Sequence, residues 1–195
     1  MMYDIKTILG IAAVVIGLIG YVPYYRDVLR GTTKPHPFTW IGLSLLLGIT
    51  FFAQLQTGGG PGAWVNGVSA FGVFGIALLA IAKGERDITR FDWMCFVGAF
   101  LGIVLWRIVG DPLVAVVIVT ITDTVVFAPT YRKAYLRPHE ETTSLYVLAA
   151  VKLAVSLFAL QSFNFTTALF PVTVMIMNAS FVILLVFRRR QLAKR

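Results

Sequence analysis

Two ionisable residues, Asp123 and Lys152, lie inside apolar segments of the chain. A charge near the centre of a bilayer costs at least ~2.5 kcal/mol on the most lenient scale, so such residues usually serve a function. On antiparallel helices their depths would differ by roughly 4–5 Å at a rise of 1.5 Å per residue. We therefore expect either a structural ion pair or an asymmetric site for a charged or polar solute. Proton coupling through Asp123 is a further alternative.

Other polar and aromatic side chains in apolar segments are candidates for solute contact. Trp64 and Asn66 open one such segment, and Asn178 lies midway along the last. An amide in hydrocarbon must find a hydrogen-bond partner, so each Asn is expected to face the interior. There it either joins helices or binds a solute, with Trp64 as a flat apolar wall. The candidate binding residues are thus Trp64, Asn66, Asp123, Lys152 and Asn178.

Pro23 and Pro129 each lie near the end of an apolar segment, and Pro129 shares its segment with Asp123. A proline inside a helix removes one backbone hydrogen bond and kinks the helix. The two prolines are therefore either static kinks or the hinges of a gate. Gly17 and Gly20 precede Pro23, where they would loosen the helix or allow close packing.

The residues do not form a recognisable catalytic or metal-binding set. His36 and His139 each follow a basic residue and a proline, which favours solvated loop histidines, and no acidic cluster at ligand spacing accompanies them. The sequence has no nucleophile elbow, phosphate-binding loop or zinc-protease motif. We expect no catalytic residue, no metal site and no cofactor. The single cysteine, Cys95, excludes a disulfide within the chain.

The elements that must position these residues are membrane-spanning helices. The chain is 58% hydrophobic and 13% charged, with a mean hydropathy of +0.82, which is too apolar for a soluble domain. Apolar runs of about 20 residues are long enough to cross a bilayer as helices. The predicted spans are residues 7–25, 37–56, 62–82, 91–109, 112–130, 142–160 and 165–187.

The placement of basic residues predicts the orientation of these spans. The loops at 26–34, 83–90 and 132–137 and the tail at 188–195 carry nearly all the Lys and Arg. The opposite face carries only Lys6 and Arg107. The positive-inside rule then places the N-terminus outside and the C-terminus in the cytoplasm of a protein of the cell membrane. Because the net charge of +8 is explained in this way, we expect no nucleic-acid partner.

The chain repeats itself. Residues 21–40 read YVPYYRDVLRGTTKPHPFTW, and residues 126–146 read VFAPTYRKAYLRPHEETTSLY. The alignment pairs Pro23 with Pro129, Tyr25 with Tyr131, Arg26 with Arg132 and, with one gap, Thr39 closely with Ser144. It also places Gly17 and Leu47 where the second copy has Asp123 and Lys152. Two copies of a helix–loop–helix unit predict a transporter built from repeats, with its site at their interface.

The repeat divides the predicted helices as three, one and three. Residues 1–86 form the first three-helix repeat, 87–110 a linker with one helix, and 111–195 the second repeat with the basic tail. One connecting helix lets the two repeats point the same way across the membrane, which predicts parallel repeats. The aromatic linker helix is expected to contact lipid and to carry no chemistry.

These motifs resemble the PQ-loop and SWEET-type transporters, including their half-size bacterial members. The resemblance covers both repeats and rests on Pro23 and Pro129, the loops TTKPHPFTW and PHEETTSLY, and WVNG at 64–67. Tyr24 and Thr130 stand where that family has its glutamine. The last helix reads Pro171-Val172 where plant members have Pro-Asn, with Asn178 about two turns later.

The resemblance implies a small-solute carrier that works by alternating access in the bilayer. Its solute would be a polar metabolite such as a sugar, an amino acid or a vitamin. The alternative is a non-transporting receptor or regulatory protein on the same scaffold, which needs an opening on one side only. Assembly into a homo-oligomer is left open.

Overall fold

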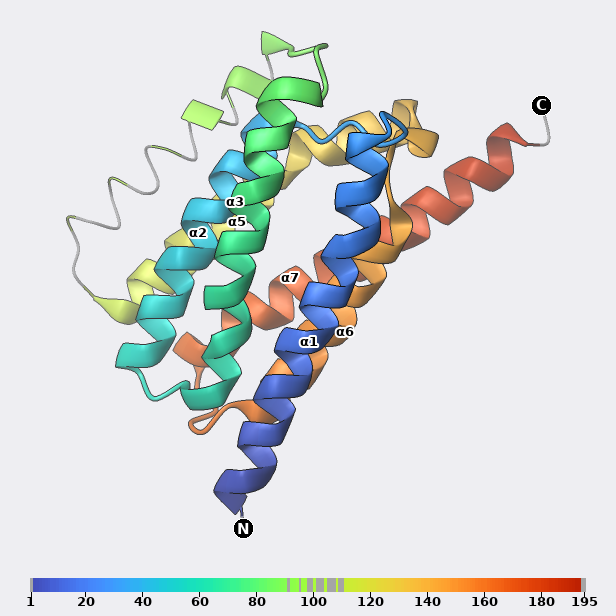
Figure 1. Cartoon of the computed structure of the whole chain (residues 1–195). Coiled ribbons are helices and arrows are strands. Elements are labelled where there is room, and N and C mark those ends of the chain that lie inside the picture. Colours follow the sequence, from blue (N-terminus) through green and yellow to red (C-terminus); the bar gives the residue numbers. More distant parts are fainter. Residues whose placement is uncertain are drawn as a thin grey trace.

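A computed structural model describes residues 2–90, 92–94, 96, 97, 100, 104, 108 and 111–193 of the 195-residue chain (Figure 1). Within these residues the regular elements are all helical. In chain order they are α1 (Met2–Leu29), α2 (Pro37–Gln56), η1 (Gly60–Ala63), α3 (Trp64–Lys83), α5 (Pro112–Leu136), η2 (Pro138–Glu140), α6 (Thr143–Ala159) and α7 (Phe165–Leu192). The predicted linker helix at 91–109 lies largely outside the described residues.

The chain has the helices of a membrane protein. Five helical segments of the described chain are long and apolar enough to span a bilayer: those of α1, α2, η1 with α3, α5 and α7. α6 is apolar but has only 17 residues. Large apolar side chains such as Phe71, Phe158 and Ile183 point outward, where they can contact lipid. The prediction of an all-α membrane protein is confirmed.

The two predicted hinge prolines lie inside their helices and not at the ends. α2 has the predicted bounds, but α1 continues past Pro23 to Leu29 and α5 past Pro129 to Leu136. A proline removes only one hydrogen bond of the helical ladder, so the remaining bonds can carry a helix onward. Each helix extends almost two further turns beyond its proline.

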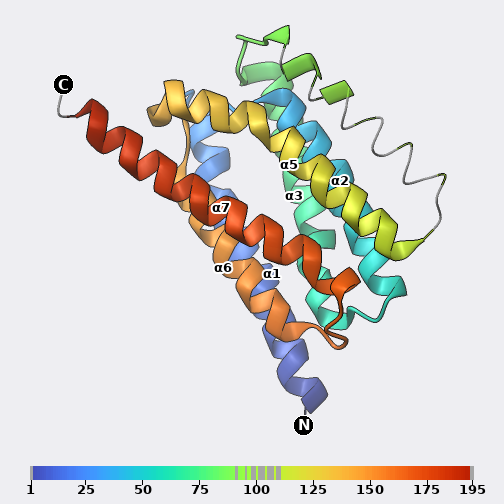
Figure 2. The same cartoon turned by 180° about the vertical axis from the view of Figure 1, so that it is seen from behind.

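The helices pack in two matched sets. α3 packs against α1 and α2, and α7 packs against α5 and α6. The two sets meet where α1 contacts α6 and where α2 contacts α5, as both views show (Figures 1 and 2). The hydroxyl of Tyr25 donates to the carbonyl of Gly72 at 2.6 Å, and that of Tyr131 donates to the carbonyl of Met177 at 2.7 Å. These tyrosines align in the sequence repeat, so the repeat has a structural counterpart in the α1–α3 and α5–α7 contacts.

The two ends of the bundle differ in composition. At one end the N-terminal part of α1, the glycine-rich turn at 57–63 and the 160–164 turn lie together (Figure 1). At the other end the loops at 30–36 and 137–142 meet, and the C-terminal part of α7 lies beside them. We call these the glycine-rich end and the charged end.

An aromatic cluster fills the interior toward the charged end. The rings of Tyr24 and Trp40 have centroids 4.9 Å apart, and those of Tyr146 and Phe181 are 4.3 Å apart. Phe127 joins the cluster edge-on at 6.0 Å from Tyr146. Since α1, α2, α5, α6 and α7 each supply at least one ring, this cluster packs the two matched sets against each other.

We predict that the close approach of α1 to α3 requires glycine at position 75. A Cβ at Gly75 would collide with the Tyr25 hydroxyl, whereas one at Gly48 would meet no atom within 4 Å. Gly75→Ala should lower the stability of the detergent-solubilised protein by about 1–3 kcal/mol through overpacking. The matched Gly48→Ala change should be neutral or stabilise by up to ~1 kcal/mol, because alanine favours helix. Thermal unfolding measures both.

The Tyr25→Phe variant is the background that isolates this contact. Tyr25→Phe removes the hydroxyl oxygen with which the new methyl group collides. Gly75→Ala should therefore lower the stability clearly less in the Tyr25→Phe background than in the unmodified chain. An equal cost in both backgrounds would contradict the packing described here.

Candidate functional site

A cavity of about 60 Å³ lies between the two matched sets of helices. On this measure about 10–15 Å³ is enough for one water molecule, so the cavity has room for a small solute. The residues that line it are Gly17, Gly20, Tyr21, Trp40, Leu43, Leu47, Asn66, Val73, Asp123, Phe127, Leu145, Tyr146, Ala149, Lys152, Leu153, Phe170, Val174, Met177 and Asn178. All six described α-helices contribute, so the cavity lies where the two matched sets of helices meet.

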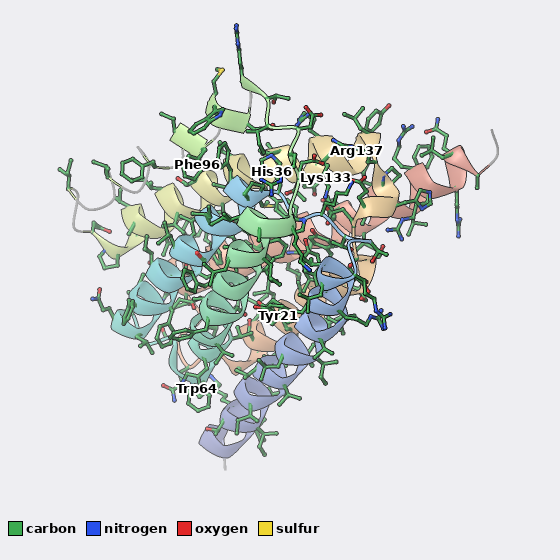
Figure 3. The ribbon with its side chains drawn as sticks, turned by 45° about the horizontal axis from the view of Figure 1, so that its top comes forward. Tyr21, His36, Trp64, Phe96, Lys133 and Arg137 are labelled. Atoms are coloured by element: carbon green, nitrogen blue, oxygen red, sulfur yellow. The ribbon has the colours of Figure 1, made fainter. Side chains whose placement is uncertain are left out.

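Most of the binding residues predicted from the sequence come together here. Asn66, Asp123, Lys152 and Asn178 line the cavity although they come from four different helices. Trp64 does not join them. It is 38% exposed at the start of α3 and points away at the glycine-rich end (Figure 3).

The predicted hinge residues separate into two groups. Gly17 and Gly20 line the cavity, whereas Pro23 and Pro129 lie in α1 and α5 outside its lining. A Cβ on Gly17 would come within 3.0 Å of the Lys152 side chain. The absence of a side chain on Gly17 therefore makes room for the long lysine.

Lys152 is held by neutral hydroxyl groups. Its ammonium group donates to the Ser69 Oγ at 2.6 Å and to the Tyr21 hydroxyl at 3.2 Å. The side chain is 7% exposed, and its Nζ lies 5.1 Å from the centre of the Tyr21 ring. An ammonium group has three donors, so two hydrogen bonds leave one N–H for a further partner. The charge itself has no carboxylate partner among the described residues.

Asp123 is buried without a partner. It is 2% exposed and lines the cavity, and its carboxylate has no hydrogen bond or ion pair with any residue the structure describes. In particular, its oxygens are more than 4.0 Å from the Lys152 nitrogen. Of the alternatives that the sequence left open, the direct ion pair is not formed in this structure.

The repeat explains why the two charges stand apart. Lys152 of α6 packs against Gly17 of α1, and the aligned positions are Leu47 of α2 and Asp123 of α5. The α1–α6 and α2–α5 contacts are the two most extensive contacts between the matched sets. Lys152 therefore lies at the α1–α6 contact, whereas Asp123 lies on α5, and both line the cavity.

The amides of the site are already engaged within the protein. Asn66 donates to the Gln54 side-chain oxygen at 2.8 Å, and the Gln54 amide donates to the carbonyl of Thr167 at 2.9 Å. Asn178 donates to the carbonyl of Val174 in its own helix. Sequence reasoning missed Gln54, although an uncharged amide within a predicted span is the same signal that identified Asn66.

A buried ion pair lies beside the cavity at the charged end. Lys133 and Glu141 are 1% and 3% exposed and form an ion pair, and the Tyr146 hydroxyl donates to Glu141 at 2.8 Å. Tyr146 also lines the cavity. Its ring is thus in the candidate site while its hydroxyl is bonded to the ion pair. Figure 3 shows Lys133 at the charged end together with His36 and Arg137.

This ion pair belongs to a larger group that joins the loops of the two repeats. Thr142 bonds Thr33 at 2.5 Å and donates to the Asp27 carboxylate at 2.9 Å, and Lys34 pairs with Glu140 at 3.2 Å. We call Asp27, Thr33, Lys34, Lys133, Glu140, Glu141 and Thr142 the interloop cluster. Sequence reasoning used these basic residues for topology only. The adjacent acids Glu140 and Glu141 in an otherwise basic loop were the signal that a cluster forms there.

His36 corrects another prediction. It is fully buried, with its Nε2 3.5 Å from Asp92, which also accepts from Arg132 at 2.8 Å. The expectation of a solvated loop histidine is therefore wrong for His36, whereas His139 is exposed. Burial lowers the pKa of His36 and outweighs the opposing attraction of Asp92.

The glycine-rich end is closed by backbone contacts. Gln161 and Ser162 donate to the carbonyls of Gly59 and Gly58 at 3.4 and 3.2 Å, and Lys6 donates to the carbonyl of Leu160 at 2.7 Å. Gly58 has φ +80°, a conformation that side-chain-bearing residues rarely adopt. Contacts between the two matched sets thus bridge both ends of the cavity.

Comparisons of the chain with protein-family models, curated proteins and solved structures found no match. The function is therefore inferred from the cavity and from the contacts that bridge its two ends.

We predict that the two buried charges respond differently to neutralisation. Asp123→Asn removes a desolvated charge without breaking a bond, so it should leave stability unchanged or raise it by about 1–3 kcal/mol. Lys152→Met breaks the bonds to Ser69 and Tyr21 and should lower stability by a similar amount. Thermal unfolding in detergent without added solute compares the two variants. A loss of about 3–5 kcal/mol in Asp123→Asn, as for a broken buried pair, would contradict the geometry.

Proposed function

We propose that this protein is a small-solute carrier that works by alternating access and resembles the PQ-loop and SWEET-type transporters. In this proposal two parallel three-helix repeats are joined by a helix at 91–109, with the N-terminus outside and the C-terminus in the cytoplasm. One observation carries the proposal. A cavity with mostly apolar walls and two ionisable side chains, Asp123 and Lys152, lies between the two matched sets of helices, and non-covalent contacts that can be exchanged for water bridge each end.

The interloop cluster is the proposed cytoplasmic gate. The bonds that cross it connect the loop after α1 with the segment after α5, including Thr33 to Thr142 and Lys34 to Glu140. Carboxylates, ammonium groups and hydroxyls are all well hydrated in water, so parting the loops exchanges their mutual bonds for water bonds. Such a gate opens without leaving unsatisfied groups in hydrocarbon.

Tyr146 links the cavity to this gate. Its ring faces the solute space, and its hydroxyl donates to Glu141 in the ion pair with Lys133. A solute that shifts the ring alters the hydrogen bond to Glu141. Differential contact of the solute with the open and closed states is what lets it change their populations.

Pro23 and Pro129 are the proposed hinges. Each proline lies almost two turns before the end of its helix and leaves the carbonyl four residues earlier without the usual N–H partner. The last turns of α1 and α5 can therefore bend relative to the rest of each helix. Because the two prolines are aligned in the repeat, the bending is symmetric about the gate.

Uptake into proteoliposomes is the direct test. The purified chain should carry a radiolabelled solute from a panel of sugars, amino acids and vitamins into vesicles faster than empty vesicles do. Replacing both Pro23 and Pro129 with Ala should slow that uptake at least about threefold while leaving thermal stability unchanged or raised, because a straighter helix bends less readily.

Gly48→Ala serves as the matched helix variant that touches neither hinge. If the variant with both prolines replaced takes up solute at the same rate as the unmodified chain, the prolines are static kinks and not hinges. Binding of a panel member from one side with no uptake of any solute would instead identify a receptor.

A further inference from the structure

The cavity holds two opposite charges that the protein does not use to satisfy each other. Asp123 is 2% exposed and has no partner among the described residues, and Lys152 is 7% exposed with hydroxyl partners only. A buried ion usually has a partner, because transfer of a charge from water into a protein costs several kcal/mol. A buried group without a partner of opposite charge either gives up its charge or takes a partner from outside the protein.

The first repeat shows that the fold does not require either charge. At the aligned positions it has Gly17 and Leu47, which also line the cavity. Only one of the two aligned pairs of positions carries charges, so the cavity is not symmetric. This asymmetry gives the cavity a negative side on α5 and a positive side on α6.

We infer that the solute is a small zwitterion whose ammonium group binds Asp123 and whose anionic group binds Lys152. The inference rests on the proposed function and specifies its solute class. A simple cation would meet the repulsion of Lys152, and a simple anion that of Asp123, so only a molecule with both charges matches both walls. The free N–H of Lys152 and the unpartnered oxygens of Asp123 supply the hydrogen bonds.

The remaining walls indicate an apolar body between the two charges. Trp40, Phe127 and Phe170 line the cavity with Leu43 and Val174. Apolar walls with a few placed polar groups are the usual form of small-molecule sites. The amides contribute less, because Asn66 and Asn178 already donate within the protein.

Calorimetric binding to the purified full chain tests the inference. The zwitterions are L-leucine, L-phenylalanine, β-alanine, 4-aminobutyrate and 6-aminohexanoate, which vary the body and the charge spacing. The leucine analogues 3-methylbutylamine and 4-methylpentanoate each lack one charge, and D-glucose lacks both. At least one zwitterion should bind, and its single-charge analogues should bind at least about tenfold more weakly.

Two variants should produce opposite patterns. Asp123→Asn should weaken zwitterion binding at least about tenfold while anion binding stays the same or strengthens, because the repulsive carboxylate is gone. Lys152→Met should weaken zwitterion binding similarly while amine binding stays the same or strengthens. Asp111→Asn and Lys83→Met remove the same charges at the exposed ends of α5 and α3 and should change nothing.

The outcomes separate this inference from the proposed function. Failure of every zwitterion to bind, or zwitterion binding unaffected by both site variants, overturns the inference. Uptake of D-glucose into vesicles that is insensitive to both variants also overturns it and leaves the carrier intact. Zwitterion binding that depends on both residues, without uptake of any zwitterion, supports the inferred site and contradicts the carrier.

Discussion

The buried ion pair between Lys133 and Glu141 is the interaction on which the charged end of the structure depends. Removing two charges from water is costly, and their attraction compensates only if hydrogen bonds satisfy the remaining groups. Here Lys133 also donates to the carbonyl of Lys34, and Glu141 accepts from Tyr146. The pair therefore fixes the loop after α1, the end of α5 and the start of α6 relative to one another.

Every polar group in the interior of the helix bundle likewise needs a hydrogen-bond partner. Most of them find one locally: Asn66 through Gln54, and Thr39 through Val126 and Thr130. The carboxylate of Asp123 is an exception within the described chain, and it lies in the wall of a cavity. A buried polar group without a partner needs an explanation, and in a cavity wall a bound solute supplies one.

The sequence predicted the helices well because their signals are local. Runs of apolar residues set the spans, so α2 was predicted with its observed bounds. The helix ends near Pro23 and Pro129 were placed too early, because the effect of a proline depends on whether neighbouring contacts support the next turns. Tyr25 and Tyr131 supply such contacts, because they bond α1 to α3 and α5 to α7. These tertiary contacts cannot be read from the sequence of one helix.

The sequence also predicted part of the site, since a charge in an apolar segment is conspicuous. It could not tell that Asp123 and Lys152 line the same cavity without forming an ion pair, which depends on tertiary packing. The burial of His36 depends on Asp92 and Arg132, distant residues whose approach is not encoded locally. Trp64 was a candidate through its neighbour Asn66, yet residues at successive helix positions point in different directions.

The central claim is that the two repeats part at the interloop cluster, and a distance measurement across that cluster tests it. Spin labels at the exposed positions Arg30 and His139, in a chain whose single cysteine Cys95 is replaced by serine, report the separation of the two loops by pulsed electron paramagnetic resonance. The account predicts two distance populations in lipid, with the longer one increased by Glu141→Gln because the buried ion pair is lost. A single short distance that Glu141→Gln leaves unchanged would contradict it.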